Sequence, residues 1–401
     1  MQKKNLFLWS LYDFANSIVY IAFLLYFAQW LVVDAGLPDF WYNALFAIAT
    51  LMLLFSAPLL AARVDKQGGG KFWLTLATLG TAAFYALAVL TAYQGTPYVW
   101  AAALLFLLGQ YCYQLSFVFY TPMLVQIAPE GKRARASGIG QFANALGQIA
   151  GVVIALPFAS THLGPMLPAV GIFLVLALPM LLFYKESPAA PTTTPHEPYF
   201  KKLSAFIFTS AAASFVVAYF FFNDAVITLS NNYAIVLQRM FEVPDTTKSL
   251  LLLAILISSA VGGVIAGWVA DKTSVYKTLI ALILGWVVML PILASAQTFV
   301  IFSGYTVIIG LLIGSSYSTS RVYLTQLLRP EEMTYGFSLF TLFERFASFV
   351  GPLAWGSTIA LVGNSSDGYR AAILSMTALM IIGLFILLKF KDGWKNPLKI
   401  S

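Results

Sequence analysis

The sequence predicts an all-α membrane protein in which twelve transmembrane helices form two six-helix bundles related by pseudo-two-fold symmetry. Three observations lead to this prediction. First, 60% of the 401 residues are hydrophobic, only 10% are charged, and the mean hydropathy is +0.83. A soluble domain of this size needs far more charge to cover its surface. Second, the apolar residues form continuous stretches of membrane-spanning length. Third, the two halves of the chain repeat weak motifs.

The apolar stretches define the expected helices in chain order. A helix needs about 20 apolar residues to cross the hydrocarbon core of a bilayer, and twelve stretches reach that length. The first one lacks a small-residue cleavage site and is longer than the apolar part of a signal peptide, so we expect it to be retained as a helix. The stretches are residues 6–33, 40–62, 72–93, 97–127, 134–160, 165–184, 203–229, 248–270, 276–296, 298–328, 333–361 and 370–390.

Most basic residues are predicted to lie on one side of the membrane. If the amino terminus is cytoplasmic and the helices alternate in direction, 18 of the 23 Lys and Arg residues fall on the cytoplasmic side. Only Arg239, Lys248 and Arg370 fall outside, while Arg321 and Arg345 lie within helices. This distribution satisfies the positive-inside rule with both termini in the cytoplasm. The net charge of +7 is therefore a topology signal and does not predict binding to nucleic acid.

A Pro/Thr-rich stretch divides the chain into two sets of six helices. Since E-S-P-A-A-P-T-T-T-P-H-E-P cannot be helical, we expect an amino-terminal bundle over 1–185, a cytoplasmic linker over 186–201 and a carboxy-terminal bundle over 202–401. The motif V-D-K-Q-G-G-G-K, with Asp65, is echoed by A-D-K-T-S-V-Y-K, with Asp271. A parallel six-plus-six repeat is typical of transporters that rock two bundles about a central cavity.

The chain lacks the residue patterns of an enzyme or a metal site. Its one cysteine, Cys112, and its two histidines, His162 and His196, have no neighbours at the spacing of metal ligands. The glycine run at 68–70 lacks the ending of a phosphate-binding loop, and no convergent nucleophile–base set is visible. We therefore expect no enzymatic activity, no cofactor, no metal and no ATP-driven mechanism.

Several motifs occur in an order typical of one transporter family. They are Y-D-F-A-N-S (12–17), F-V-F-Y-T-P-M-L (117–124) with R-A-R-A-S-G-I-G (133–140), F-N-D-A-V-I-T (222–228), S-R-V-Y-L-T-Q-L-L-R-P-E (320–331) and R-F-A-S-F-V-G-P (345–352). In these motifs the chain resembles the major facilitator superfamily, and more narrowly its vacuole-effluxer-like branch, which includes an autophagy-related vacuolar amino-acid exporter. It departs from the branch at Thr121-Pro122 and Gln148. The resemblance implies the major facilitator fold, secondary transport and, from the eukaryotic members, export of neutral amino acids.

Only five charges lie well within the expected spans: Asp13, Asp224, Arg321, Glu344 and Arg345. A lipid-facing charge at the bilayer centre costs at least ~2.5–3.5 kcal/mol, so each should face a partner, a cavity or a helix interface. In the fold that the chain resembles, the first, fourth, seventh and tenth helices line the central cavity. One hypothesis is that Asp13 and Arg321 meet across the halves and close a cytoplasmic gate. The alternative is that each is satisfied within its own half. Arg345, Asp65 and Asp271 are further candidates for gating charge pairs.

Two other carboxylates are alternative candidates for proton coupling. Desolvation favours the neutral form of a carboxylate, which would let it bind and release a proton. Asp224 is preferred over Glu344, because the resemblance places the helix of Glu344 at the periphery of the cavity. Glu344 could instead pair with a charge on another helix or with Arg345, although adjacent residues point about 100° apart on a helix.

Neutral polar and aromatic side chains complete the candidate substrate site. Asn16 follows Asp13 by three residues, so the two lie nearly on one helix face. Aromatic residues of the first, fourth and seventh stretches could line an amphipathic pocket; they are Tyr12, Tyr20, Tyr26, Phe119, Tyr120, Phe220, Phe221 and Phe222. The candidates for substrate binding or proton coupling are Asp13, Asn16, Tyr12, Tyr120, Asn223, Asp224 and Glu344.

The leading prediction is a secondary active transporter that moves a small organic solute by alternating access with proton coupling. The alternative is an uncoupled facilitator or a lipid or drug exporter of the same fold. We expect a monomer whose basic loops meet anionic headgroups on the cytoplasmic side. If the chain is prokaryotic, its place is the inner membrane.

Overall fold

Regular secondary structure is entirely helical in the part of the chain that the structure describes. The computed structural model describes residues 3–129, 133–186, 211–328, 340, 343–344 and 346–389. The helices are α1 (Lys3–Ala22), π-helical turns Phe23–Phe27 and Trp30–Asp34, α2 (Asp39–Gln67), α3 (Gly70–Ala92), α4 (Val99–Tyr120), α5 (Met123–Ile127), α6 (Arg133–Ala155), α7 (Met166–Phe183), α9 (Ala211–Phe241), α10 (Asp245–Lys272), α11 (Val275–Ser295), α12 (Phe299–Leu327), α14 (Val350–Val362) and α15 (Ser366–Lys389), with short 3₁₀ turns at Thr96–Tyr98 and Leu156–Phe158. Within these described ranges, 11 helices are long and apolar enough to cross a membrane, and α14 is a shorter apolar helix. The predicted all-α fold is confirmed.

The chain groups into two compact units that do not coincide with a single cut in the sequence. Unit 1 consists of Met1–Thr194, Asn231–Gln238 and Glu242–Leu250, and unit 2 consists of Pro195–Ser230, Arg239–Phe241 and Leu251–Ser401. The end of α9 and the start of α10 therefore belong with the amino-terminal helices.

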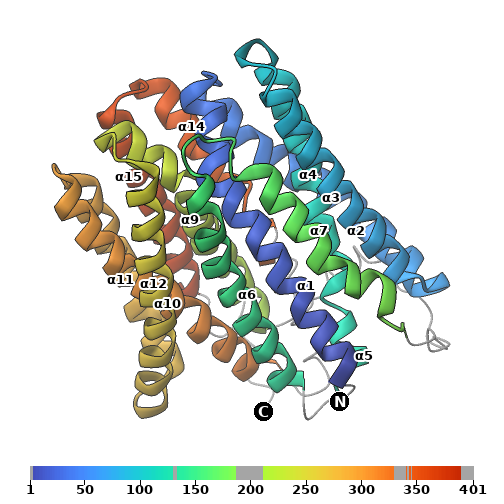
Figure 1. Ribbon diagram of the computed structural model, residues 1–401. Helices are drawn as coiled ribbons and strands as arrows, with labels where there is room; N and C mark the ends of the chain where they lie inside the picture. The colour runs from blue at the N-terminus through green and yellow to red at the C-terminus, as the bar shows by residue number, and fades with distance from the viewer. Residues whose placement is uncertain are drawn as a thin grey trace. The chain divides into compact units, whose positions relative to one another are not determined.

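In unit 1 successive long helices run in opposite directions, and hydrogen bonds join the chain at both ends of the unit. Helix α1 packs against α6 and α7, α3 packs against α4 and α7, and α2 packs against α4 (Figure 1). At one end, the Asn5 amide donates to the carbonyl of Lys185, which joins the start of α1 to the end of α7. At the other end, the Tyr93 hydroxyl donates to the carbonyl of Leu163, which joins α3 to the α6–α7 connection.

Glycine allows α6 to approach α1 closely. A Cβ at Gly147 would meet the backbone of Phe14, and a Cβ at Gly151 would contact the backbone of Ile18. Small residues at such positions let transmembrane backbones come together where no hydrophobic force drives association. The glycines of α6 thus hold the polar face of α1 against α6.

In unit 2, glycines likewise allow α10 and α12 to approach each other closely. A Cβ at Gly310 would meet the backbone of Ile255, and one at Gly314 would meet the carbonyl oxygen of Ser259. Helix α11 packs against α12 and α15, and α14 packs against α15. A Cβ at Gly383 of α15 would also reach the carbonyl oxygen of Ala218 on α9.

Three predicted spans differ from the helices observed. The 97–127 stretch is interrupted after Tyr120, because Pro122 cannot donate a backbone hydrogen bond and restricts the residue before it. The 203–229 stretch is too short at its end, since α9 continues to Phe241. The 333–361 stretch lies partly outside the described residues, and its last part forms α14 from Val350.

The loop of the repeated Asp-Lys motif in unit 1 is held by a carboxylate at the end of α7. Gly68 and Gly69 have φ of +72° and +85°, which suits glycine and turns the chain between α2 and α3. Glu186 then accepts hydrogen bonds from the backbone N–H groups of Gly70 (2.8 Å) and Lys71 (3.2 Å) at the start of α3. The Lys71 ammonium donates to the carbonyl of Tyr184 at 2.8 Å.

Glu186→Ala should lower stability, because it leaves two N–H groups of the first turn of α3 without their acceptor. We expect a loss of about 1 kcal/mol, in the range for helix caps, seen as a lower melting temperature in detergent. Asp367→Ala is the matched control, since that side chain is 89% exposed and lies 4.0 Å from Arg370; it should change stability by less than ~0.5 kcal/mol. Equal effects of the two substitutions would contradict the capping role.

Candidate functional site

The aromatic candidates on α1 and α4 form a buried stack in unit 1. The rings of Trp9 and Tyr120 lie 4.7 Å apart with an interplanar angle of 3°. The Trp9 indole donates to the Tyr120 carbonyl at 3.1 Å, and the Tyr120 hydroxyl donates to the Trp9 carbonyl at 3.0 Å. Tyr12 is fully buried and shares a hydrogen bond of 2.7 Å with the hydroxyl of Thr78. Tyr12 and Tyr120 are thus fixed by neighbours, which favours a supporting role.

Asp13 ends a chain of amide hydrogen bonds that crosses from α6 to α1. The side chain of Asp13 is 4% exposed, and its Oδ1 accepts a hydrogen bond of 2.9 Å from Asn144. The Asn144 oxygen in turn accepts from Gln148 at 2.7 Å, one turn further along α6. Asn144 and Gln148 are half-buried, whereas Asp13 is inside the unit. The carboxylate therefore has a polar route toward the less buried face of α6.

Two buried amides predicted from the sequence lack hydrogen bonds of ordinary geometry. Asn16 in unit 1 and Asn223 in unit 2 are each 1% exposed. Among the described residues, the amide of Asn223 finds no partner, and that of Asn16 has only a loose contact with the Tyr12 hydroxyl. A buried polar group without a partner costs about 1–3 kcal/mol, so such groups mark places where a ligand or water is bound. Asn16 and Asn223 thus have unused hydrogen-bonding capacity inside their units.

Asp224 has a structural partner in unit 2. It is fully buried, and its Oδ2 accepts a hydrogen bond of 2.7 Å from the backbone N–H of Gly351. Its Oδ1 accepts a longer bond of 3.4 Å from the hydroxyl of Thr228. Gly351 lies in the first turn of α14, where the helix dipole favours a negative charge. The Asp224 carboxylate therefore caps α14.

The structure describes the side chains of three of the remaining charged candidates. Glu344 is a half-buried helical residue, Arg321 is half-buried on α12, and Asp271 is exposed near the end of α10. Asp65 lies in α2, but its side chain is not described, and Arg345 lies outside the described residues. Asp13 belongs to unit 1 and Arg321 to unit 2, so their pairing stays a prediction.

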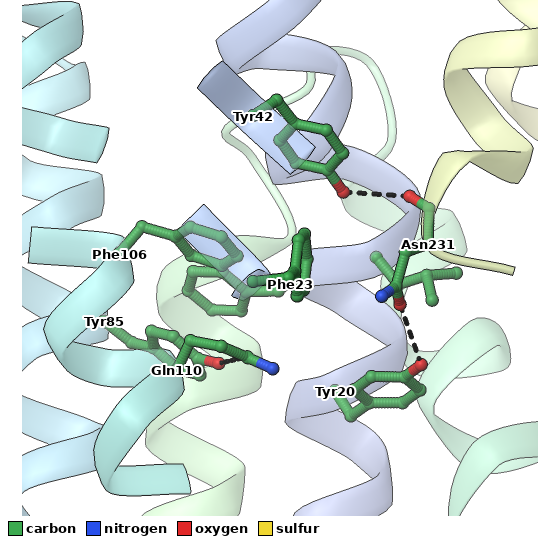
Figure 2. A pocket seen from close by; sticks show the side chains of 9 residues that line it. Tyr20, Phe23, Tyr42, Tyr85, Phe106, Gln110 and Asn231 are labelled. Atoms are coloured by element: carbon green, nitrogen blue, oxygen red, sulfur yellow. Dashed lines mark hydrogen bonds between the residues drawn. The ribbon is translucent and has the colours of Figure 1, made fainter. Parts of the chain in front are cut away.

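A pocket in unit 1 collects residues from five helices, α1, α2, α3, α4 and α9, around a polar edge. Figure 2 shows Tyr20 and Asn231 joined by a hydrogen bond, with Tyr42 bonded to the Asn231 carbonyl. The two bonds measure 3.2 Å and 2.9 Å. On the opposite side the Tyr85 hydroxyl donates to Gln110 at 2.7 Å. The lining residues are Tyr20, Phe23, Leu24, Tyr42, Phe46, Tyr85, Phe106, Gln110 and Asn231.

A π-helical turn in the first transmembrane segment contributes two residues to the pocket. Phe23 and Leu24 begin the turn Phe23–Phe27, and such turns are common at functional sites because they shift side chains from the α-helical register. The ring of Phe23 stacks on Tyr85 at 3.9 Å and faces Phe106 at 6.0 Å. The volume open to the centre of a water molecule is about 10 Å³, which is room for about one water.

Most of this pocket was not predicted from the sequence. Tyr20 was among the aromatic residues expected to line a pocket, but Tyr42, Gln110 and Asn231 were not candidates. Asn231 was missed because the predicted helix ended at residue 229, whereas α9 continues through it to Phe241. A signal was present: S-N-N at 230–232 places three polar residues in succession within an apolar chain.

These features define the class of the protein. Apolar spans that carry buried amides and carboxylates, with an aromatic pocket inside one helical unit, are those of a multi-pass membrane protein. The chain belongs to the Major Facilitator Superfamily, which matches residues 2–152 and 215–399, so it is a transporter of a small-molecule substrate and not an enzyme.

Known proteins show how widely the likeness extends. Over 361 residues the chain is 28% identical to an uncharacterized protein of Aquifex aeolicus (strain VF5), with 87% of each chain covered. A crystal structure of a single-site mutant of the nucleoside transporter NupG has a TM-score of 0.76 at 13% identity, covering 96% of this chain and 99% of that one. An inward-facing, unoccupied bacterial homolog of the human lysosomal transporter Spinster has a TM-score of 0.75 at 13% identity, covering 98% and 99%. At these identities the two structures establish the fold.

Proposed function

We propose that the protein is a secondary active transporter that moves a small organic solute by alternating access, with protons as the coupling ion. The observation that supports this most strongly is the pair of buried amides without hydrogen bonds of ordinary geometry, Asn16 and Asn223. They occupy corresponding helices of the two halves, α1 and α9, next to Asp13 and Asp224. Burial without a partner is unfavourable, so each amide is suited to a solute or water that arrives during the transport cycle.

The pocket of Figure 2 has room for about one water in this conformation, so it would have to widen during the cycle to take a solute. Its lining suits an uncharged or zwitterionic solute with a flat apolar part. No Asp, Glu, Lys, Arg or His is among its lining residues, so a solute with a net charge would lose its hydration without gaining an ionic partner. Its aromatic rings offer stacking surfaces, and Gln110 and Asn231 offer amide groups. Neutral amino acids, suggested by the vacuole-effluxer-like resemblance, and nucleosides, the solutes of NupG, are the classes to test first.

Asp13 is the better candidate for the coupling proton. Asp224 accepts a backbone N–H bond at the start of α14, so neutralising it would weaken a helix cap. Asp13 accepts from the side chain of Asn144, which can rearrange without loss of a cap. This reverses the preference drawn from the sequence. Glu344 stays a candidate of lower rank, because it is half-buried.

The uncoupled facilitator is the second candidate function, and the pocket itself favours it. The lining is mostly aromatic and apolar and contains no carboxylate, so solute binding and proton binding would occur at different places. In this alternative Asp13 and Asn144 brace α1 against α6. The two functions differ in whether an imposed pH gradient drives accumulation.

Further parts of the proposal concern placement and assembly. We propose that both termini are cytoplasmic, that the basic loops meet anionic headgroups, that the protein is a monomer, and that it exports its solute. The two bundles would be 1–185 and 202–401, joined by the linker 186–201. The Asp13–Arg321 gate and the candidates Asp65, Asp271 and Arg345 belong to the same proposal.

A counterflow screen in proteoliposomes tests the function. Vesicles loaded with one unlabelled solute should accumulate the same labelled solute, with neutral amino acids and nucleosides tested first. An imposed pH gradient should then drive accumulation above equilibrium. Counterflow without any effect of the gradient would favour the facilitator, and the absence of counterflow for all uncharged solutes would contradict the substrate class.

Asn231→Leu should lower transport by tenfold or more with little change in melting temperature. The substitution keeps the backbone carbonyl that accepts from Tyr42 but removes the amide that faces Tyr20. A tenfold loss of affinity corresponds to about 1.4 kcal/mol, which is the size of one good polar contact to a solute. The control is Ser230→Ala, because that hydroxyl bonds the carbonyl of Val226 on its own helix and is not in the lining. Equal transport by the two variants would show that the pocket does not bind the solute.

A further inference from the structure

A cluster of four ionisable side chains lies at the end of unit 1 opposite to Asn5 and Lys185. The His162 imidazole, in the α6–α7 connection, stands between two carboxylates. Its Nδ1 lies 2.6 Å from Asp34 at the end of the first transmembrane segment, and its Nε2 lies 3.1 Å from Asp245 at the start of α10. Lys248 of α10 lies 2.7 Å from the other oxygen of Asp245.

The cluster is largely withdrawn from water. The exposed fractions of the side chains are 16% for His162, 12% for Asp245 and 2% for Lys248, while Asp34 is 39% exposed. The Lys248 ammonium also donates to Gln29 of the first segment, and to Gln238 near the end of α9. These contacts connect the α9–α10 corner to the first segment and to the α6–α7 connection, all within unit 1.

The geometry requires both ring nitrogens of His162 to donate. A neutral imidazole carries one N–H, so one of its nitrogens would present a lone pair to a carboxylate. A protonated imidazole donates to Asp34 and Asp245 together, and with Lys248 it balances the two negative charges. Loss of the proton therefore breaks one contact and leaves a net negative charge in a largely buried place, which is unfavourable.

Electrostatics agrees with the geometry. Burial lowers the pKa of His162, but hydrogen bonds and charge attraction from Asp245 and Asp34 outweigh it and raise the pKa to about 9. The groups that face the ring are Asp34 from the first segment, and Asp245 with its partner Lys248 from α10. Nearby, the Tyr26 hydroxyl bonds Ser249 at 2.9 Å and adds a neutral contact to the same corner.

We propose that His162 is a proton-binding site that acts as a latch: the protonated ring holds the α9–α10 corner against the first segment and the α6–α7 connection, and loss of the proton releases that corner. This proposal does not depend on the solute or on proton-coupled transport. The stabilisation of the closed latch is complete below the pKa of an exposed histidine, about 6.5, and is lost as pH rises through about 9. The ratio of closed to released latch should therefore fall on the order of 100-fold between pH 6 and pH 10.

Double electron–electron resonance on the full chain in nanodiscs tests the latch. Spin labels are placed at Gln94→Cys and Thr246→Cys, two exposed positions of unit 1, after Cys112→Ala has removed the native thiol. We expect one narrow distance population at pH 7 and a second, longer population that grows with a midpoint near pH 9. His162→Gln should show the longer population at every pH, because glutamine cannot carry the charge.

Two further variants separate the latch from a general effect of alkali. His196→Gln, at the other histidine of the chain, should keep the wild-type titration. Asp245→Asn should lower the midpoint by about one pH unit or more, because one of the two carboxylates that favour the charged ring is removed. A distance distribution that does not change between pH 6 and pH 10, or a titration that persists in His162→Gln, would overturn the proposal.

Discussion

Gly314→Ala should be among the most destabilising single-methyl substitutions in unit 2. The new Cβ would meet the carbonyl oxygen of Ser259, a backbone atom that cannot rotate away, so α12 and α10 would have to separate. Overpacking of this kind costs about 1–3 kcal/mol and occasionally more. We expect a value near 3 kcal/mol, because the contacts of the neighbouring Gly310 with Ser258 and Ile255 would be disturbed as well. The measurement is thermal unfolding in one detergent at one heating rate.

Gly304→Ala is the matched control on the same helix. No heavy atom lies within 4 Å of the position where its Cβ would stand, so the methyl group meets nothing. Alanine is also favoured over glycine inside a helix by up to ~1 kcal/mol. The two substitutions should therefore change the melting temperature in opposite directions. A Gly314→Ala protein that melts at or above the wild-type temperature would show that the α10–α12 contact is looser than described.

The existence of the helices was predictable from the sequence because each is a long apolar run, but their ends were not. The apolar stretch was predicted to stop at residue 229, whereas helix α9 continues to Phe241. In the structure Asn232 exchanges two amide hydrogen bonds with Asn43, at 2.8 Å and 3.1 Å, and Asn231 is bonded by Tyr20. Contacts 189 and 211 residues away in the chain therefore satisfy these side chains inside the helix, and local hydropathy contains no information about them.

The buried polar residues of the candidate site could be predicted from the sequence, but their hydrogen-bond partners could not. Rare polar residues in apolar helices identified Asp13, Asn16, Asn223 and Asp224 as buried, and all four are. The partner of Asp13 is an amide 131 residues away, and that of Asp224 is a backbone N–H 127 residues away. A backbone donor leaves no trace in the sequence, so the capping role of Asp224 could not be inferred from it. The latch at His162 was likewise missed, because its carboxylates are distant in the chain.

In both units a buried carboxylate faces a neighbouring helix, but the groups that donate hydrogen bonds to it differ. In each, a carboxylate on the first helix of the bundle faces the fifth: Asp13 of α1 faces Asn144 of α6, and Asp224 of α9 faces the start of α14. A glycine brings the paired helices close in both, Gly147 in α6 and Gly351 in α14. Each unit thus has a buried carboxylate that faces a closely packed helix. The difference in partner, side-chain amide against backbone N–H, is what would let the two carboxylates differ in function.

Asp13→Asn should abolish accumulation driven by a pH gradient while solute counterflow persists, if Asp13 carries the coupling proton. Asparagine resembles the neutral carboxylic acid in size and can still accept the hydrogen bond from Asn144, so packing of α1 against α6 should be retained. It cannot bind and release a proton, so an imposed pH gradient should no longer drive accumulation of the solute. Counterflow exchanges solute for solute and needs no change of protonation. The readout is the ratio of gradient-driven to counterflow uptake in the same vesicles, which should fall by tenfold or more.

Asp224→Asn makes the matched comparison in the other half. The amide oxygen can accept from Gly351, but the negative charge at the start of α14 is lost, which costs about 0.3–2 kcal/mol at a helix terminus. We therefore expect a lower melting temperature with an unchanged ratio of gradient-driven to counterflow uptake. The opposite result, in which Asp224→Asn loses the gradient response and Asp13→Asn keeps it, would move the coupling site to α9. Full gradient response in both variants would remove both carboxylates from coupling and leave Glu344 as the candidate among the charges of the apolar spans.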